Sequence, residues 1–402
     1  MGAQSLSADI FKTSSQTLFN VLVWLALTWL AAALGLMALS ALHLQEEDNL
    51  AELALAAGIG LGLISILFSL IGFARFFTPA AAWIFVILLS LLTCRRWRDL
   101  FYKLKTALHW PPYASKFERL IFIFALLVLV TSFITALTPP VAWDALTYHL
   151  VGPKLYIEAG TFVHPLDIPQ LGFPLLGQMH FTLGILLAGE GTAALFHFGY
   201  GLLALALVIS LTREQVGRAA AWLAALALLS VPLFTTLLSW PYVDVTLLFY
   251  TTAVFTTFYR WQQQKQTGWL VVLGMMLGFS GGLKYTAVAM PLAVTAGIVF
   301  ASRRDGLLTI LKRLVLVGAV ALLLVLPWLL ENYLTTGNPV YPVLIADAKF
   351  WDGWRTWWYS RPGTGVLQTS PASLLLAPLE ATILDGTLAG NPFDGAVGPS
   401  DL

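Results

Sequence analysis

Long apolar runs separated by short polar segments dominate the sequence. Most of these runs contain close to 20 residues, and about 20 apolar residues are enough for an α-helix to cross the ~30 Å hydrocarbon core of a bilayer. The pattern predicts an all-α polytopic membrane protein. We expect about ten transmembrane helices, at residues 21–42, 51–73, 77–94, 119–137, 192–211, 219–238, 242–259, 268–284, 286–301 and 314–330.

Composition strengthens this prediction and excludes several classes of protein. The 402 residues are 58% hydrophobic and 11% charged, whereas about 25% of residues are charged in soluble domains. The net charge of +1 does not suit a nucleic-acid-binding protein, which typically carries a basic excess. Because Cys94 is the single cysteine, a disulfide framework and a cysteine-based metal cluster are both excluded.

Lysine and arginine mark one side of the predicted bundle. Cytoplasmic loops of membrane proteins are enriched in these residues, and the connection at 95–118 is the most basic segment of the chain. Three later connections, near 213–218, 260–265 and 303–313, are also basic. We therefore place these four connections in the cytoplasm, and the N-terminus outside.

The complementary segments are predicted to be extracytoplasmic, and the largest of them is the loop at 138–191. Within it, residues 172–188 are apolar, but a crossing there would reverse the sidedness of every later loop. We expect a helix that lies in the outer interface or dips in without crossing, with Gln178 and His180 partly hydrated. The predicted domains are a three-helix membrane extension (1–94), a basic cytoplasmic loop (95–118), a transmembrane core (119–330) and an extracytoplasmic segment rich in Trp, Pro and Gly (331–402).

Ionisable residues beside a membrane are costly and are candidates for function. Asp144 follows the span at 119–137, and Tyr148 lies four residues further on, next to His149. One interpretation is that Asp144 caps a helix N-terminus. The other is that it acts as a general base for an acceptor hydroxyl, with Tyr148 on the same helical face.

Three other charged residues fall on the predicted outer side. Asp244 either suits the start of a helix or faces Asp144 across one cavity, where it would orient an acceptor or help to hold a divalent cation. Lys284, which follows Gly281-Gly282-Leu283 and precedes Tyr285, either snorkels to the lipid headgroups or pairs with a phosphate. Lys154 is a second phosphate candidate, although snorkelling is the favoured interpretation for this lysine.

The remaining polar residues carry weaker signals. Asn332 and Tyr333 precede a Gly-Asn-Pro turn and are expected to line the same outer cavity. His164, His180 and His197 lack the spacing of metal ligands and are expected to be structural or interfacial. The sequence has no Walker loop, no Gly-x-Gly-x-x-Gly segment and no Gly-x-Ser-x-Gly elbow.

Several short motifs occur in the order seen in one known group of proteins. They are Trp143-Asp144-Ala145-Leu146-Thr147-Tyr148-His149-Leu150, Tyr242-Val243-Asp244, Gly282-Leu283-Lys284-Tyr285-Thr286, and Asn332 with Gly337-Asn338-Pro339. Over about residues 115–345 the chain resembles polytopic glycosyltransferases of the GT-C superfamily, in particular bacterial relatives of the dolichyl-phosphate-mannose protein mannosyltransferase and aminoarabinose transferase families.

The resemblance implies an inverting transferase in the bacterial plasma membrane, with its active site on the extracytoplasmic side. It would move a sugar from a polyprenyl-phosphate donor to a lipid, glycan or protein acceptor. Asp144 would be the catalytic base, Asp244 a supporting acid and Lys284 a cation for the donor phosphate. No cofactor is required, and a divalent cation is optional.

Two other classes of function remain open. A non-catalytic membrane subunit would keep the fold without the activity. A secondary transporter would place charged residues near the bilayer midplane and show paired repeats. The candidate residues here lie at the outer edge, and the sequence shows no such repeat.

Overall fold

The computed structural model describes residues 2–46, 48–108, 115–165, 168–341 and 353. In this part of the chain every regular element is helical, so the predicted fold class is confirmed as all-α. The α-helices are α1 (Gly2–Ala41), α2 (Asn49–Phe73), α3 (Pro79–Thr93), α4 (Trp97–Ala107), α5 (Lys116–Ala136), α6 (Val151–Ala159), α7 (Leu176–Leu187), α8 (Thr192–Gln215), α9 (Arg218–Leu229), α10 (Pro232–Leu237), α11 (Asp244–Gln264), α12 (Thr267–Gly281), α13 (Ala289–Ala301) and α14 (Leu307–Thr336). Short helical turns are η1 (Cys94–Arg96), η2 (Ala145–His149), η3 (Pro169–Gly172) and η4 (Tyr285–Val288).

Six segments in the described part are long and apolar enough to cross a membrane. They are Thr13–Ala41, Asn49–Phe73, Pro79–Ala107, Lys116–Ala136, Thr192–Gln215 and Leu307–Thr336. A multi-pass membrane protein is therefore confirmed. The other predicted spans coincide with helices that do not meet these criteria, namely α9 with α10, α11, α12 and α13.

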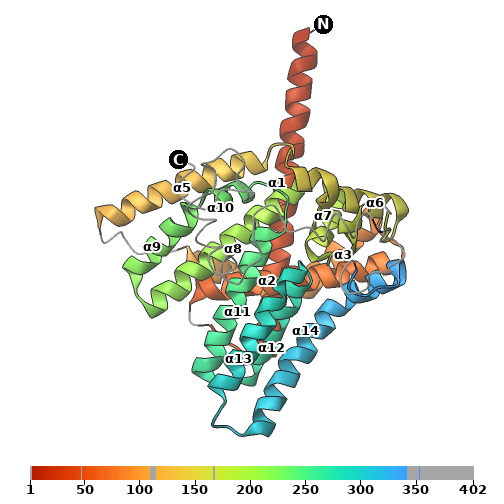
Figure 1. Ribbon diagram of the computed structural model, residues 1–402. Helices are drawn as coiled ribbons and strands as arrows, with labels where there is room; N and C mark the ends of the chain where they lie inside the picture. Colours follow the sequence, from red (N-terminus) through yellow and green to blue (C-terminus); the bar gives the residue numbers. More distant parts are fainter. Residues whose placement is uncertain (1, 47, 109–114, 166–167, 342–352, 354–402) are drawn as a thin grey trace.

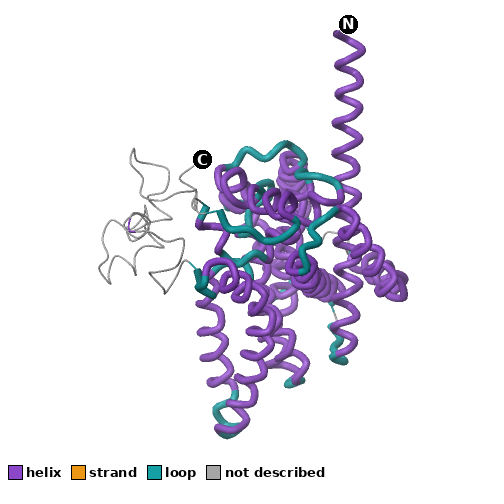
Figure 2. The backbone as a smooth tube through the Cα atoms, turned by 90° about the vertical axis from the view of Figure 1, so that its right-hand side faces the viewer, coloured by secondary structure: helices purple, strands orange, loops and turns teal. Residues whose placement is uncertain are grey.

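The first two helices pack with their backbones in close contact. A Cβ atom on Gly35 would lie 1.8 Å from the carbonyl oxygen of Ala56, and one on Gly60 would lie 1.8 Å from that of Ala31. Small residues at such crossings are typical of membrane helix pairs. In Figure 1 and Figure 2 the first turns of α1 project beyond the rest of the bundle.

Charged residues connect several polar segments at one end of the bundle. Arg260, near the end of α11, contacts Glu46 and Glu214, each at 2.5 Å. Arg213, near the end of α8, contacts Asp48 at 2.7 Å. The acidic turn after α1 therefore lies with two of the basic connections, and α1 begins at the opposite end of the bundle.

The predicted outer segments meet at that opposite end. The N–H of Phe77, which precedes α3, donates to the carbonyl of Gly160 at 3.1 Å. The N–H of Asp144, after α5, donates to the hydroxyl of Tyr242, before α11, at 3.0 Å. The loop at 138–191 thus packs against the other segments assigned to the same side.

Helix α7 lies where the non-crossing helix was expected, but its surroundings differ from the prediction. Gln178 and His180 are 3% and 1% exposed, so the expected hydration is wrong. The helix packs against α2, α6 and α8 inside the protein. The polar side chains are stable there because Gln178 bonds to His149 and His180 bonds to the carbonyl of Leu61. The predicted extracytoplasmic segment at 331–402 lies almost entirely outside the described residues.

Candidate functional site

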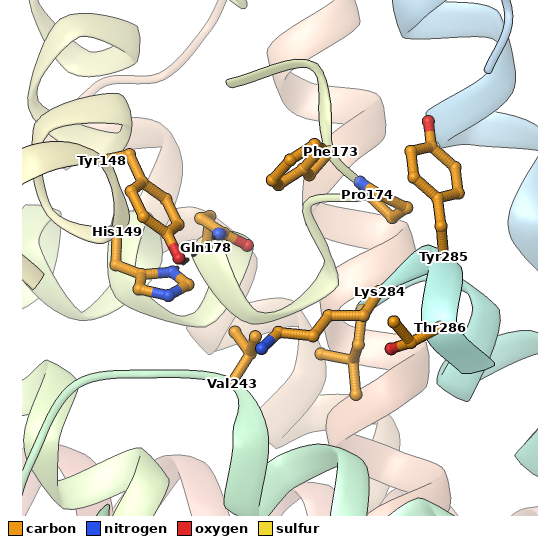
Figure 3. A pocket seen from close by; sticks show the side chains of 10 residues that line it. Tyr148, His149, Phe173, Pro174, Gln178, Val243, Lys284, Tyr285 and Thr286 are labelled. Carbon is orange, nitrogen blue, oxygen red and sulfur yellow. Dashed lines mark hydrogen bonds between the residues drawn. The ribbon is translucent and has the colours of Figure 1, made fainter. Parts of the chain in front are cut away.

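A cavity of about 250 Å³ lies at the end of the bundle where the predicted outer segments meet. Segments far apart in the sequence line it, and Figure 3 shows their side chains around one space. The lining residues are Tyr148, His149, Phe173, Pro174, Gln178, Val243, Leu283, Lys284, Tyr285 and Thr286.

Asp144 is not among the lining residues, but it contacts one of them, Tyr148. The hydroxyl of Tyr148 donates to Asp144 Oδ2 at 2.9 Å. Asp144 occupies the N-cap position of η2, but its side chain makes no capping hydrogen bond. Capping therefore does not explain the carboxylate, which instead pairs with a phenol that lines the cavity.

The hydroxyl of Tyr148 is held in its protonated form. Burial raises the pKa of this phenol above its usual value, and the nearby charges of Asp144 and Asp244 raise it further. The hydroxyl therefore remains a donor to Asp144 at neutral and moderately alkaline pH. The effect of Asp244 also shows that both predicted acids lie close to Tyr148.

Lys284 and Asp244 form an ion pair beside the same cavity. Lys284 Nζ lies 2.6 Å from Asp244 Oδ1. Lys284 lines the cavity, and its side chain is 32% exposed. The structure therefore brings together the predicted acids and the predicted phosphate cation, with the lysine bound to one of the acids.

His149 and Gln178 form a second polar pair at the cavity. The Gln178 amide Nε2 lies 3.0 Å from His149 Nδ1, and both side chains are buried. Burial, together with the positive charge of Lys284, holds the pKa of His149 well below its usual value. The imidazole is therefore neutral.

Tyr285 forms one wall of the cavity and is fixed from behind. Its hydroxyl donates to the carbonyl of Tyr341 at 3.0 Å and accepts from the Asn332 side chain at 3.1 Å. Asn332 also donates to the carbonyl of Gly172 at 2.7 Å. The sequence predicts Asn332 at the cavity, but it is not among the lining residues. Its side-chain amide instead bonds to the Tyr285 hydroxyl and the Gly172 carbonyl. Tyr333 is 59% exposed.

The loop that carries Lys284 depends on close packing at Gly282. A Cβ atom there would lie 2.7 Å from Trp328 Nε1. The N–H of Leu176, at the start of α7, donates to the carbonyl of Gly282 at 2.9 Å. The glycine therefore allows α7, α14 and the Lys284 loop to meet.

The other sequence candidates lie elsewhere. Lys154 pairs with Glu190 at 2.9 Å and does not line the cavity. His197 is structural, as predicted: its Nε2 accepts from the N–H of Val245 at 3.0 Å and its Nδ1 donates to the carbonyl of Leu237 at 2.7 Å. These bonds fix the first turn of α11, which begins at Asp244.

Sequence reasoning missed Gln178 as a cavity residue. The sequence pattern places it on a hydrated surface, since a polar residue in an apolar run suggests an interface. The signal that the sequence offers is an amide within a long apolar run. Such an amide can be buried if it finds hydrogen-bond partners.

The described residues offer no group of three or more His, Cys, Asp or Glu side chains suited to a metal ion. The optional divalent cation therefore has no ligand set of that kind in this part of the chain.

Comparison with known proteins identifies one family. Residues 174–330 match the family model of dolichyl-phosphate-mannose-protein mannosyltransferases, a narrower region than the resemblance suggested. Comparisons with curated proteins and with solved structures gave no match. The matched segment contains Gln178, Asp244 and Lys284, whereas Asp144 precedes it. The resemblance to GT-C glycosyltransferases is confirmed over residues 174–330, the segment that is similar to this mannosyltransferase family.

Proposed function

We propose that the protein transfers a sugar from a polyprenyl-phosphate donor to an acceptor hydroxyl, with inversion at the anomeric carbon. One observation carries this proposal: the Asp144–Tyr148 pair and the Asp244–Lys284 pair meet at a single cavity. A carboxylate and a cation at one site are the groups that such a transfer needs, since a proton must leave the acceptor and a phosphate must leave the sugar.

Asp144 is the general base in this mechanism. Its Oδ1, the oxygen that Tyr148 does not hold, takes the proton of the acceptor hydroxyl. The acceptor oxygen then forms a bond to the anomeric carbon from the face opposite the phosphate. Tyr148 orients the carboxylate, because a fixed hydrogen bond reduces the number of conformations that the base samples.

Lys284 stabilises the leaving group. As the bond from the anomeric carbon to the phosphate oxygen breaks, its electron pair moves to that oxygen, and the polyprenyl phosphate departs with the added negative charge. A lysine ammonium binds phosphate as a compact positive charge. The donor phosphate would compete with Asp244 for Lys284, and Asp244 would keep the ammonium positioned until the donor binds.

The active site is assigned to the extracytoplasmic side of the plasma membrane. This assignment is supported by the cavity's position opposite the end where Arg213 and Arg260 bind the turn after α1, since basic segments favour the cytoplasm. A lipid-linked donor reaches such a site from the bilayer. The acceptor is a hydroxyl on a lipid, glycan or protein, and no cofactor enters the reaction.

Replacing Asp144 with Asn tests this proposal. Removal of a general base typically lowers the rate by about 100-fold or more, so D144N should lose at least that much turnover in membranes supplied with polyprenyl-phosphate sugars. The matched control is Glu158→Gln, which removes an exposed carboxylate of α6 and should retain activity. Full turnover by D144N would remove Asp144 from the role of base.

Tyr148→Phe provides a second test of the same pair. Loss of the 2.9 Å hydrogen bond should lower turnover by about 10-fold, in line with a charge-assisted hydrogen bond. It should have little further effect in the D144N background, because the two residues act as a unit. Additive losses in the double variant would contradict the proposed orientation of the base by Tyr148.

A further inference from the structure

Two buried polar atoms at the cavity have no hydrogen-bond partner among the described residues. They are His149 Nε2 and Gln178 Oε1. Both residues line the cavity, and their side chains are 1% and 3% exposed. An unpaired buried polar group costs free energy, so a ligand group that pairs with these atoms would be stabilised at the cavity.

The bond between the two side chains determines what the free atoms can do. An amide nitrogen is a donor, so the Gln178 Nε2 donates to His149 Nδ1. The neutral imidazole then carries its proton on Nε2. The pair therefore presents one free donor, the His149 Nε2–H, and one free acceptor, the Gln178 Oε1.

A donor and an acceptor on neighbouring groups match the chemistry of an alcohol. A hydroxyl both donates and accepts hydrogen bonds, whereas a phosphate oxygen accepts and an alkyl chain does neither. The pair is also uncharged, which favours a neutral ligand group over an anion.

The position of the pair indicates which substrate supplies the hydroxyl. Lys284 acts electrostatically on His149, and Figure 3 shows Lys284 reaching toward the His149 and Gln178 end of the cavity. A group bound there would lie beside a phosphate held by Lys284, and the sugar ring is attached directly to that phosphate in the donor.

We infer that His149 and Gln178 form a subsite for a hydroxyl of the transferred sugar. This inference rests on the proposed function and adds a specificity element to it. The subsite accounts for both unpartnered atoms and assigns Gln178 a role in selecting the sugar. A donor whose sugar lacks the recognised hydroxyl would leave both atoms unpaired.

Binding of donor analogues to the full chain in lipid nanodiscs tests the inference without an acceptor. The probes are short-chain polyprenyl phosphates carrying mannose, glucose, galactose or arabinose, the monodeoxy series of the tightest binder, and polyprenyl phosphate without sugar. Wild-type protein should bind one monodeoxy analogue about 10-fold more weakly than its parent, as expected for a buried pair left unsatisfied. This comparison uses the wild-type protein alone, so its result does not depend on whether a variant folds.

Gln178→Met should then abolish the difference, because it replaces the amide with an apolar side chain of similar length. Met179→Leu is the matched control: this neighbour on α7 is buried and is not among the cavity-lining residues, so discrimination should persist. Retention of discrimination in Gln178→Met would overturn the subsite.

The remaining outcomes separate the inference from the proposed function. Binding of all sugar phosphates and monodeoxy analogues with equal affinity would refute the subsite while supporting a polyprenyl-phosphate donor. Hydroxyl discrimination seen with soluble alkyl glycosides, and absent with the lipid phosphates, would assign the subsite to the acceptor and overturn the inference. Failure of every polyprenyl phosphate to bind would refute both proposals.

Discussion

Lys284 Nζ contacts Asp244 Oδ1 at 2.6 Å beside the candidate cavity, although 40 residues separate them in the chain. The carboxylate occupies the place beside the ammonium that a phosphate oxygen would take. Both side chains are about one-third exposed, so the pair is accessible to a competing anion. In the proposed mechanism, donor-phosphate binding would therefore compete with the internal ion pair for the same cation.

Substitutions of the two partners of this pair should change the affinity for polyprenyl phosphate in opposite directions. Lys284→Met removes the cation, and we expect affinity to fall by about 10-fold or more. Asp244→Asn removes the competing carboxylate while leaving the lysine, so affinity should rise by a few-fold. Equilibrium binding in nanodiscs measures both. A weaker affinity in Asp244→Asn would show that the carboxylate positions the lysine more than it competes.

Gly282→Ala should disturb the Lys284 loop. The new Cβ would lie 2.7 Å from Trp328 Nε1, and overpacking of this kind typically costs about 1–3 kcal/mol. We expect a lower Tm in detergent and reduced transfer. Gly318→Ala in α14 is the matched control, since nothing lies within 4 Å of its added Cβ and alanine favours a helix. Equal behaviour of the two variants would contradict the close-packing argument.

Cysteine labelling tests the sidedness of the cavity. In a Cys94→Ser background, Glu158→Cys places an exposed thiol on the outer loop and His43→Cys places one at the end with the basic connections. A membrane-impermeant maleimide applied to intact cells should modify position 158, whereas position 43 should react after the cells are lysed. The reverse pattern would place the cavity in the cytoplasm.

The stability of the folded protein should fall as the pH is lowered through the range in which histidine in the unfolded chain takes up a proton. Burial holds the pKa of His149 well below its usual value in the folded protein, whereas an unfolded histidine binds a proton near pH ~6.5. The unfolded chain therefore takes up more protons as the pH drops from about 7 to 5, and the folded state loses relative stability. We expect Tm to decline over this range, and to decline less in His149→Gln. A slope unchanged by the substitution would refute this contribution of His149.

Part of the site could be predicted from local sequence. Asp144 and Tyr148 are four residues apart, so their proximity follows from helical spacing, and the structure brings them into contact. The contact between Asp244 and Lys284 joins α11 to the turn after α12 and depends on how those helices pack. Local spacing contains no such information.

The errors also have physical causes. Gln178 and Asn332 are amides near apolar segments, and sequence patterns alone suggested a wet surface or a cavity wall for them. Both amides are buried and paired instead: Gln178 lines the cavity and bonds to His149, whereas Asn332 does not line it and bonds to Gly172 and Tyr285. Which partners a buried amide finds depends on segments more than 25 residues away in the chain.

The sequence by itself determined the helical membrane class, because apolar run length and the cost of burying unpaired backbone groups in lipid permit few alternatives. The placement of lysine and arginine also predicted which loops share a side. The tertiary structure decided which polar side chains face one another, that Lys284 is held by Asp244, and that His149 and Gln178 leave a donor and an acceptor at the cavity. Those relationships arise from the packing of distant helices, which hydrophobic pattern and charge do not specify.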